Sequence, residues 1–189
     1  GNKAPEDVIN KIEDSGIKVV AFEGRNLQET YESIVNTGKV MGTEEAAMEI
    51  VDSMKKKVDE IEGKVESVHR PKTYFVISYG ESGDFTAGSG SFIDEMITTA
   101  GGENVAGDIE QEWIEYSIEK LVENAPEIIL ATRDINPDGI KDTPGYKELD
   151  AIKEGKIVVL DDNLVTRAGP RIVEGLEEIA KSLHPDLFK

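Results

Sequence analysis

Residues 73–117, TYFVISYGESGDFTAGSGSFIDEMITTAGGENVAGDIEQEWIEYS, are the stretch around which the rest of the chain is organised. The apolar run Tyr74–Ile77 predicts a buried strand. A glycine-rich loop containing Phe85 follows, and then a helical pattern runs from Ser91 to Ala100, where two glycines end it. In open α/β sheets, ligands bind at the carboxyl ends of strands, where a loop of this kind lies. We therefore expect a ligand-binding mouth in this stretch.

From Pro71 onward, strand and helix patterns alternate along the chain. Alternation of this kind is typical of a parallel sheet covered by helices. The predicted strands are Tyr74–Ser78, Glu127–Ala131 and Lys156–Leu160, and the predicted helices are Ser91–Ala100, Ile118–Asn124, Tyr146–Lys153 and Arg171–Leu183.

A long helical pattern precedes this part of the chain and runs from Glu44 to about Val68, with Thr43 as its cap. Its apolar residues recur every three or four positions, and at 1.5 Å per residue the helix would span ~35 Å. One interpretation is a coiled-coil arm. Because the helix lies between two α/β segments, we favour a strut that joins two lobes.

The first 42 residues predict a helix, a strand and a second helix. Gly16 ends the first helix, and Ile17–Phe22 is the strand candidate. Asn26, with Glu29 three residues later, resembles a capping box for a helix from Leu27 to about Thr37, ended by Gly38. One strand flanked by two helices cannot form a core of its own, so we interpret this segment as the end of a larger lobe.

The predicted fold class is therefore α/β, in three parts. Residues 71–189 form a C-terminal lobe with a parallel sheet covered by helices, and residues 44–70 form the long inter-lobe helix. Residues 1–43 form a remnant of an N-terminal α/β lobe. A domain of 189 residues would bury ~70% of its unfolded surface.

Composition excludes several classes of function. Twenty-one basic and 39 acidic residues give a net charge of −18, which argues against nucleic acid or an anionic membrane as the main partner. The chain has no cysteine, so disulfides and thiolate metal sites are excluded. No apolar run approaches the ~20 residues that a membrane span needs. The chain opens on GNKAPEDV without a leader pattern, and we expect an upstream segment to precede it.

The inventory of catalytic residues is poor. There is no Ser-His-Asp arrangement, no cysteine nucleophile and no carboxylate pair in an apolar context. His69 and His184 lie far apart in the sequence, without a partner at metal-ligand spacing. The run Gly88–Ser91 lacks the lysine of a phosphate-binding loop and is interpreted as a tight turn. We predict a binding protein and not an enzyme; the alternatives are a flavodoxin-like α/β enzyme that uses a nucleotide or cofactor, and an isolated interaction domain.

Five residues are candidates for ligand contact. Trp113 stands in the polar segment EQEWIEY, where a structural tryptophan would have more apolar neighbours. Tyr79 follows a buried strand at its carboxyl end, and Phe85 and Thr86 lie in the loop at the same mouth; burial is the alternative for all three. Arg167 lies between the last strand and the last helix, where it could bind an anionic group or pair with an acidic neighbour. Arg171, inside that helix, is interpreted as structural.

Three segments together resemble a known family: DFTAGSGSFIDEMITTAGGENVAGD, EWIEYSIEKLVENAPEIIL and GKIVVLDDNLVTRAGPRIVEGLEEIAKSLHP. They are similar to the periplasmic or lipoprotein-type binding proteins of ABC importers for iron-siderophores, haem and cobalamin. That family has two α/β lobes joined by one long helix. Its opening strands have no counterpart here, so the resemblance implies a ligand cleft of which this chain presents only one wall.

The resemblance also implies partners and a location. The ligand is a metal chelate, which carries the metal with it, so the protein itself needs no cofactor and no metal site. Trp113 matches a tryptophan of the cleft, and Glu119 matches a glutamate that docks onto the membrane permease of the importer. The location is extracytoplasmic, with membrane contact only through a lipid anchor or the permease. Leu164 and Val165 stand where relatives often place aromatic residues, and the sequence does not identify the chelate.

Overall fold

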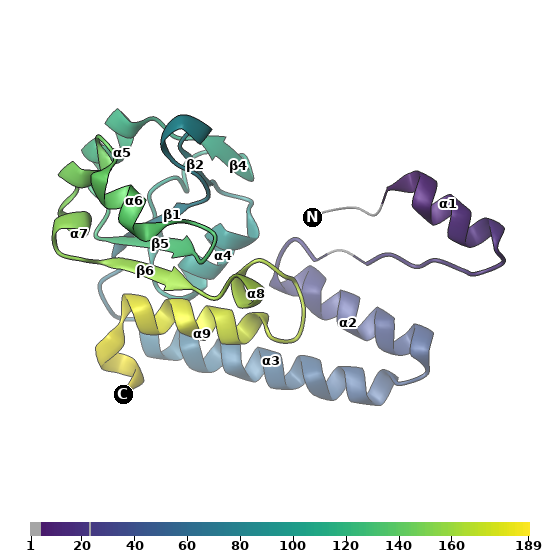
Figure 1. Ribbon diagram of the computed structural model, residues 1–189. Helices are drawn as coiled ribbons and strands as arrows, with labels where there is room; N and C mark the ends of the chain where they lie inside the picture. Colours follow the sequence, from purple (N-terminus) through teal and green to yellow (C-terminus); the bar gives the residue numbers. More distant parts are fainter. Residues whose placement is uncertain (1–4, 23) are drawn as a thin grey trace.

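The computed structural model describes residues 5–22 and 24–189, and it confirms an α/β fold with a parallel sheet covered by helices (Figure 1). Four parallel strands form the sheet, in the spatial order β3, β1, β5, β6. They are β1 (Lys72–Val76), β3 (Glu103–Asn104), β5 (Ile128–Thr132) and β6 (Ile157–Leu160).

The two faces of the sheet are buried in two separate cores, because successive side chains of a strand point to opposite faces. On β1, Phe75 packs into one core, while Tyr74 and Val76 pack into the other. The first core contains α3 (Glu44–Val65), α4 (Phe92–Thr99) and α9 (Ile172–Leu183). The second contains α5 (Ile118–Asn124), α6 (Pro137–Asp142), η2 (Tyr146–Glu148) and α7 (Asp150–Lys153). The helix that was expected over Tyr146–Lys153 is interrupted at Leu149 and consists of the two short helices η2 and α7.

A small antiparallel pair of strands was not predicted. It consists of β2 (Phe85–Ala87) and β4 (Trp113–Glu115), which the sequence analysis treated as loop. Each strand has three residues, too few to show an alternating pattern. The two-residue strand β3 and four further short helices were also missed; the helices are η1 (Gly80–Ser82), α6, α8 (Asp162–Val165) and η3 (Pro185–Phe188).

The long helix α3 is continuous, as predicted, and ends three residues before Val68. Part of its apolar stripe packs in the core shared with α4 and α9: Val51, Met54, Val58 and Ile61. Lys57 of α3 also pairs with Glu177 of α9, at 2.7 Å. The amino-terminal part of α3 extends beyond the sheet and packs along α2 (Figure 1). These contacts favour the strut over the coiled-coil arm; the division at residues 43 and 70 stays a prediction.

The predicted end of α2 at Gly38 was wrong, because α2 runs from Leu27 to Met41. Gly42, in the left-handed conformation with φ 71°, ends the helix. Gly38 serves a different purpose: a Cβ atom there would lie 2.4 Å from the Cβ of Ala47 on α3. The glycine therefore allows α2 and α3 to pack closely.

The predicted strand Ile17–Phe22 was also wrong. Residues 17–22 pair with no strand of the described chain, and Ile17 and Val20 are 59% and 53% exposed. A strand needs a neighbour to satisfy its backbone groups, and the described residues around this segment supply none.

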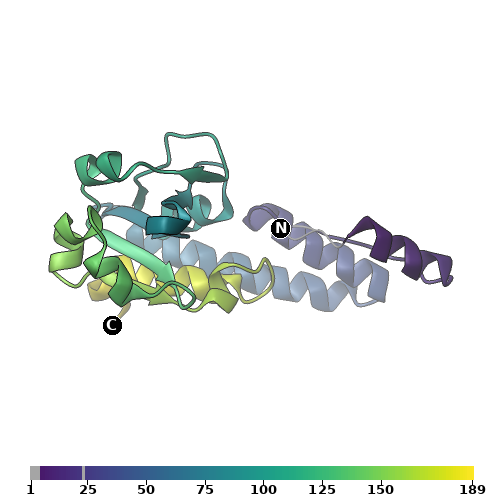
Figure 2. The same ribbon diagram turned by 45° about the horizontal axis from the view of Figure 1, so that its top comes forward.

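The first helix is confirmed as α1 (Glu6–Asp14), and both views show it lying away from the sheet (Figures 1 and 2). Nine of the thirteen large apolar side chains that are exposed in the described chain belong to residues 8–50.

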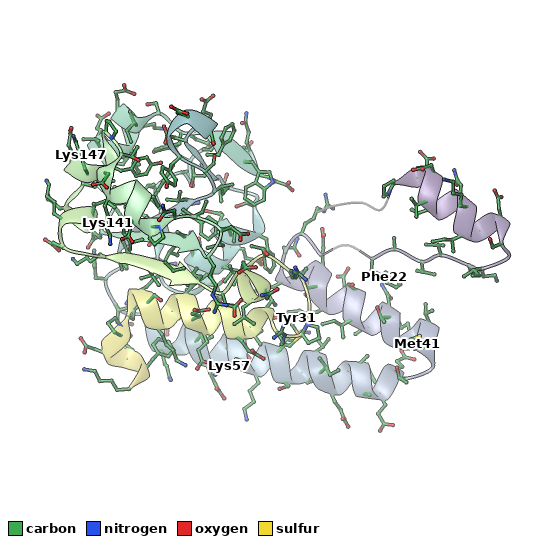
Figure 3. All side chains as sticks on the ribbon, in the orientation of Figure 1. Phe22, Tyr31, Met41, Lys57, Lys141 and Lys147 are labelled. Atoms are coloured by element: carbon green, nitrogen blue, oxygen red, sulfur yellow. The ribbon has the colours of Figure 1, made fainter. Side chains whose placement is uncertain are left out.

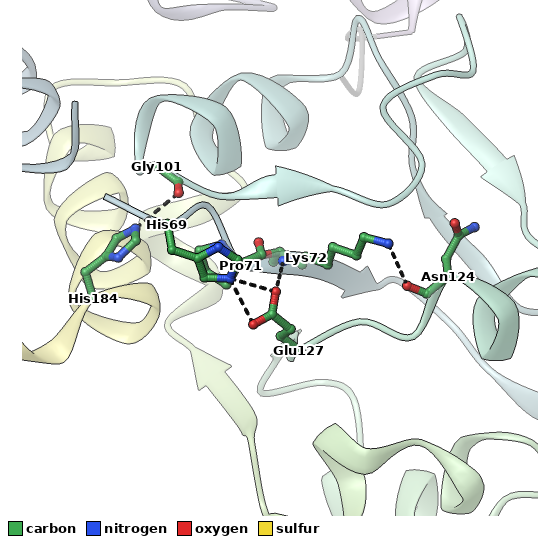
Figure 4. A network of polar contacts seen from close by, with 8 residues as sticks. His69, Pro71, Lys72, Gly101, Asn124, Glu127 and His184 are labelled. Atoms are coloured by element: carbon green, nitrogen blue, oxygen red, sulfur yellow. Dashed lines mark hydrogen bonds and ion pairs between the residues drawn. The ribbon is translucent and has the colours of Figure 1, made fainter. Parts of the chain in front are cut away.

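A polar network holds the segment between α3 and β1 (Figure 4). Both carboxylate oxygens of Glu127 lie 3.0–3.1 Å from Nε2 of His69, and the backbone N–H of Lys72 donates to the same carboxylate. Burial opposes ionisation of Glu127, but the hydrogen bonds from Lys72 and His69 outweigh it and hold the pKa of the carboxyl below its usual value. His184 contacts the carbonyl of Gly101 at 3.1 Å. Both histidines thus have structural partners that their sequence spacing did not reveal.

We expect Gly38→Ala to lower the free energy of unfolding by about 1–3 kcal/mol, because the added methyl group overlaps Ala47. Gly63→Ala is the matched control, since a Cβ atom at this position of α3 meets nothing within 4 Å. The control should gain about 0.4–1 kcal/mol from the smaller entropy of its unfolded chain. Urea unfolding followed by circular dichroism measures both, and equal stability of the two variants would contradict close packing at Gly38.

Candidate functional site

A cavity of about 1240 Å³ lies between the pair of helices α2 and α3 and the carboxyl end of the sheet. Its sheet side contains the end of β1, the start of α4, Thr132 at the end of β5, and the loop before α9. Its other side is formed by Phe22, Gly24 and Arg25 and by the facing surfaces of α2 and α3. Residues that line it include Thr30, Ile34, Ala47, Phe75, Ile93 and Trp113. The carboxyl end of a parallel sheet is where ligands bind in this fold class.

The cavity therefore has two sides, where the sequence analysis expected one wall of a cleft. The second side comes from residues just before α2, such as Phe22 and Gly24, and from residues of α2 and α3, such as Thr37 and Ile50. Sequence patterns placed Thr37 and Ile50 on helices and Phe22 at the end of a strand, but gave no sign that α2 and α3 would face the carboxyl end of the sheet across an open space.

Trp113 lies in the wall of this cavity and is 52% exposed. Its strand β4 pairs with β2, so that Ala87 lies opposite Trp113 and Ile114 points to the interior. Because side chains alternate along a strand, the burial of Ile114 turns the indole of Trp113 outward. The structure thus places Trp113 where a ligand would meet it; the contact itself stays a prediction.

Tyr79, Phe85 and Thr86 do not line the cavity. The hydroxyl of Thr86 is fully buried and donates to the carbonyl of Phe75 at 2.7 Å. The hydroxyl of Tyr79 donates to the carbonyl of Asn136 at 3.1 Å, and its ring meets Tyr146 edge-on. Phe85 is half-buried in β2. All three have the packing roles that the sequence analysis gave as the alternative, so their ligand roles stay predictions without support from this geometry.

Arg167 is exposed at the rim, between the cavity-lining residues Thr166 and Ala168. It forms no ion pair with any residue that the structure describes. Asp161, six residues earlier in the chain, pairs with Arg133 at 3.2 Å. The backbone N–H of Asn163, together with the nearby arginines, holds the pKa of the Asp161 carboxyl below its usual value. An unshared guanidinium at a cavity rim can bind a carboxylate or another planar anion.

Sequence reasoning missed Arg25, Ser91 and Thr132 as cavity residues. Arg25 pairs with Glu29 at 3.1 Å. Asn26 caps α2 as predicted, but the Glu29 carboxylate accepts from the N–H of Arg25, one residue before the position that a capping box requires. The strand-to-helix turn before Ser91 is the signal that could have identified this residue.

The run Gly88–Ser91 is a tight turn, as interpreted. A Cβ atom at Gly88 would lie 2.4 Å from the carbonyl oxygen of Gln111, so the two loops touch. The hydroxyl of Ser91 accepts from the N–H of Asp94 and caps α4. This geometry fixes the start of α4 at the cavity and leaves no open cradle for phosphate.

Glu119 lies outside the cavity, on the exposed surface of α5. Ser117 caps this helix, since its hydroxyl accepts from the N–H of Lys120 at 3.2 Å. Glu119 itself makes no ion pair within the described chain, so its carboxylate faces solvent.

Within residues 5–22 and 24–189, no helix is long and apolar enough to cross a membrane. These residues also contain no group of three His, Asp or Glu side chains that could hold a metal ion.

Comparison with known proteins gives one consistent result. The family model described as periplasmic binding protein matches residues 2–164. An uncharacterised ABC transporter substrate-binding lipoprotein of Bacillus subtilis, YvrC, is 31% identical over 98% of this chain and 60% of its own length. A cobalamin-binding protein of Halobacterium salinarum is 24% identical over 97% of this chain and 52% of its own. The chain thus spans little more than half the length of these relatives.

A solved structure is similar as well. A possible iron-binding, periplasmic solute-binding protein of Staphylococcus epidermidis superposes with a TM-score of 0.84 at 28% identity. The match covers 94% of this chain and 70% of that protein.

We expect Thr86→Val to lower the free energy of unfolding by about 1–3 kcal/mol, because it leaves the carbonyl of Phe75 without its buried donor. Thr166→Val is the matched control, because the hydroxyl of Thr166 donates to the carbonyl of Asp162 in an exposed position. In the variant, water can donate to this carbonyl in place of the hydroxyl, so the stability should change little. Thermal unfolding checks both. If Thr86→Val has unchanged stability but binds a chelate more weakly, the packing role is contradicted and a ligand-binding role for Thr86 is supported.

Proposed function

Because this chain belongs to the periplasmic binding protein family, we propose that it is the ligand-binding part of an ABC importer. Its ligand is a metal chelate of the iron-siderophore, haem or cobalamin type, which it delivers to the membrane permease. The names of the relatives support this proposal: a substrate-binding lipoprotein of an ABC transporter, a cobalamin-binding protein and a possible iron-binding protein. The same names support an extracytoplasmic location.

The observation that carries the proposal is the cavity with Trp113 in its wall and Arg167 at its rim. Its volume of about 1240 Å³ exceeds the ~300–1,000 Å³ of common small-molecule sites, which favours a large ligand. An exposed indole offers a flat apolar surface, and an unshared guanidinium offers two parallel donors to an anionic group. Together they favour a large, partly apolar chelate that carries negative charge.

Binding is favoured over catalysis by the chemistry of the cavity. Among the described residues that line it, Glu112 is the one carboxylate, and none is a histidine or a lysine. A lone carboxylate beside an exposed tryptophan does not supply the acid–base pair that hydrolysis or group transfer needs. The flavodoxin-like enzyme is therefore the less favoured reading.

The proposal is tested by titrating the protein with hemin, cyanocobalamin and ferrichrome. Trp113 is the only tryptophan, so its fluorescence reports on the cavity alone. We expect saturable quenching by at least one chelate, and equilibrium dialysis should retain the same compound. Arg167→Ala should weaken binding of an anionic chelate about tenfold, the effect of losing a charge-assisted hydrogen bond.

Two controls make this titration decisive. N-acetyltryptophanamide in the same solutions corrects for light absorbed by the chelates. Lys147→Ala removes an exposed cation that does not line the cavity, and its affinity should match that of the unchanged protein. Retention of ATP or flavin mononucleotide, with no chelate retained, would favour the enzyme instead.

The second test concerns Glu119 and the permease. A solvent-facing carboxylate sets docking register and encounter rate, while contributing little to the stability of its own protein. In a form of the protein that contains both lobes, we expect Glu119→Ala to reduce permease binding and transport, and to leave folding and chelate affinity unchanged.

The matched control is Glu123→Ala, which removes an exposed carboxylate one turn further along α5. Vesicle uptake assays compare the two variants. If Glu119→Ala transports normally but melts several degrees lower, Glu119 acts only at the start of its helix and the docking role fails.

A further inference from the structure

A side chain of the α/β lobe holds the first residue of α2. The backbone N–H of Leu27 donates to Oε2 of Glu95 on α4, at 2.7 Å, across 68 positions of sequence. The first N–H groups of a helix have no partner within the helix, so an outside acceptor of negative charge suits this place. Asn26 satisfies the N–H of Glu29, and Glu95 satisfies that of Leu27.

This hydrogen bond lies beside both sides of the cavity. Arg25 lies two residues before Leu27, just ahead of α2, and Thr30 lies three residues after it on the helix; both line the cavity. On α4, Phe92 and Ile93 line it one turn before Glu95. The contact thus joins an element of one cavity side to an element of the other.

The surroundings of Glu95 indicate that its carboxylate is held by the hydrogen bond from Leu27 and not by a cation among the described residues. The carboxylate is half-buried, and it forms no ion pair with a cation of the described chain. Burial raises the pKa of Glu95, while the N–H of Leu27 opposes that rise by stabilising the charged form. Leu27 and Tyr31 of α2 are buried in the core that also contains Ile93 and Met96 of α4.

Figure 3 shows where the two ends of α2 lie relative to the α/β lobe. Tyr31 lies near the lobe, whereas Met41, the last residue of α2, lies at the far end of the helix pair. A small tilt at the amino end of α2 would therefore move its far end by a larger distance and change the width of the cavity.

We propose that Glu95 is a positioning residue, which sets the width of the cavity by fixing the amino end of α2 to α4. Its effect on chelate affinity rests on the proposed function. Its effect on the position of α2 does not, so the two can be measured separately.

The experiment measures a distance in the absence of ligand. The chain contains no cysteine, so Met41→Cys and Lys147→Cys place two spin labels at unique sites, one on α2 and one on the lobe (Figure 3). Met41 is 70% exposed and Lys147 is also exposed, so the labels disturb little packing. Double electron–electron resonance then gives the distance distribution between α2 and the lobe.

We expect Glu95→Ala to broaden and shift this distribution, and Glu95→Gln to restore it, because the amide keeps an acceptor oxygen. Glu177→Gln is the matched control: it weakens the pair between Lys57 and Glu177, which also joins a helix to the lobe but lies away from the cavity. This control should leave the distribution unchanged.

A second pair of variants removes the donor instead of the acceptor. Leu27→Pro deletes the N–H at the first helical position, where proline is tolerated, and Leu27→Ala shortens the side chain but keeps the N–H. Leu27→Pro should reproduce the effect of Glu95→Ala, and Leu27→Ala should not. This comparison remains informative if Glu95→Ala fails to fold.

Unchanged distributions in Glu95→Ala and Leu27→Pro would overturn the proposal, as would an equal change in Glu177→Gln. If the distribution changes, hemin and cyanocobalamin titrations should show a loss of affinity of about tenfold for the retained chelate. A changed distribution with no chelate bound by any variant would leave the positioning role intact and count against the proposed function alone.

Discussion

Burial of the α3 stripe in the core of the α/β lobe is the contact on which the rest of the structure depends. Val51, Met54, Val58 and Ile61 are nearly inaccessible to solvent and pack in one core with the sheet. Each contributes about 1.5–3 kcal/mol relative to an exposed position. The contact fixes the direction in which α3 leaves the lobe. Since α2 packs along α3, it also determines where the second side of the cavity lies.

The polarity of the sheet determines the other side. All four strands are parallel, so their carboxyl ends lie at one edge, and the chain must leave each strand there. The turn before α4, Thr132 and the loop before α9 consequently meet at this edge, although they are far apart in sequence. The β2–β4 pair adds Trp113 to the same wall. The opposite edge holds the network of His69 and Glu127, which is structural in character (Figure 4).

Electrostatics act on two length scales at this cavity. The net charge of −18 repels an anionic ligand at long range. That repulsion is screened beyond about 8 Å at physiological ionic strength, whereas a guanidinium that touches the ligand is not. In the proposed complex, contact with Arg167 would therefore outweigh the long-range repulsion by the total charge.

The sequence by itself determined the features that depend on neighbouring residues. Apolar runs located β1, β5 and β6, the three-to-four spacing located α3, and the cap at Asn26 located the start of α2. The polar context of Trp113 led to the prediction of ligand contact, and the indole is exposed in the wall of the cavity. Only the tertiary structure decided that residues 17–22 form no strand, that Thr86 is buried, that Arg167 has no ionic partner among the described residues, and that Glu95 holds α2. The physical reason is that strand pairing, burial and ion pairing depend on residues tens of positions away, which no local pattern records.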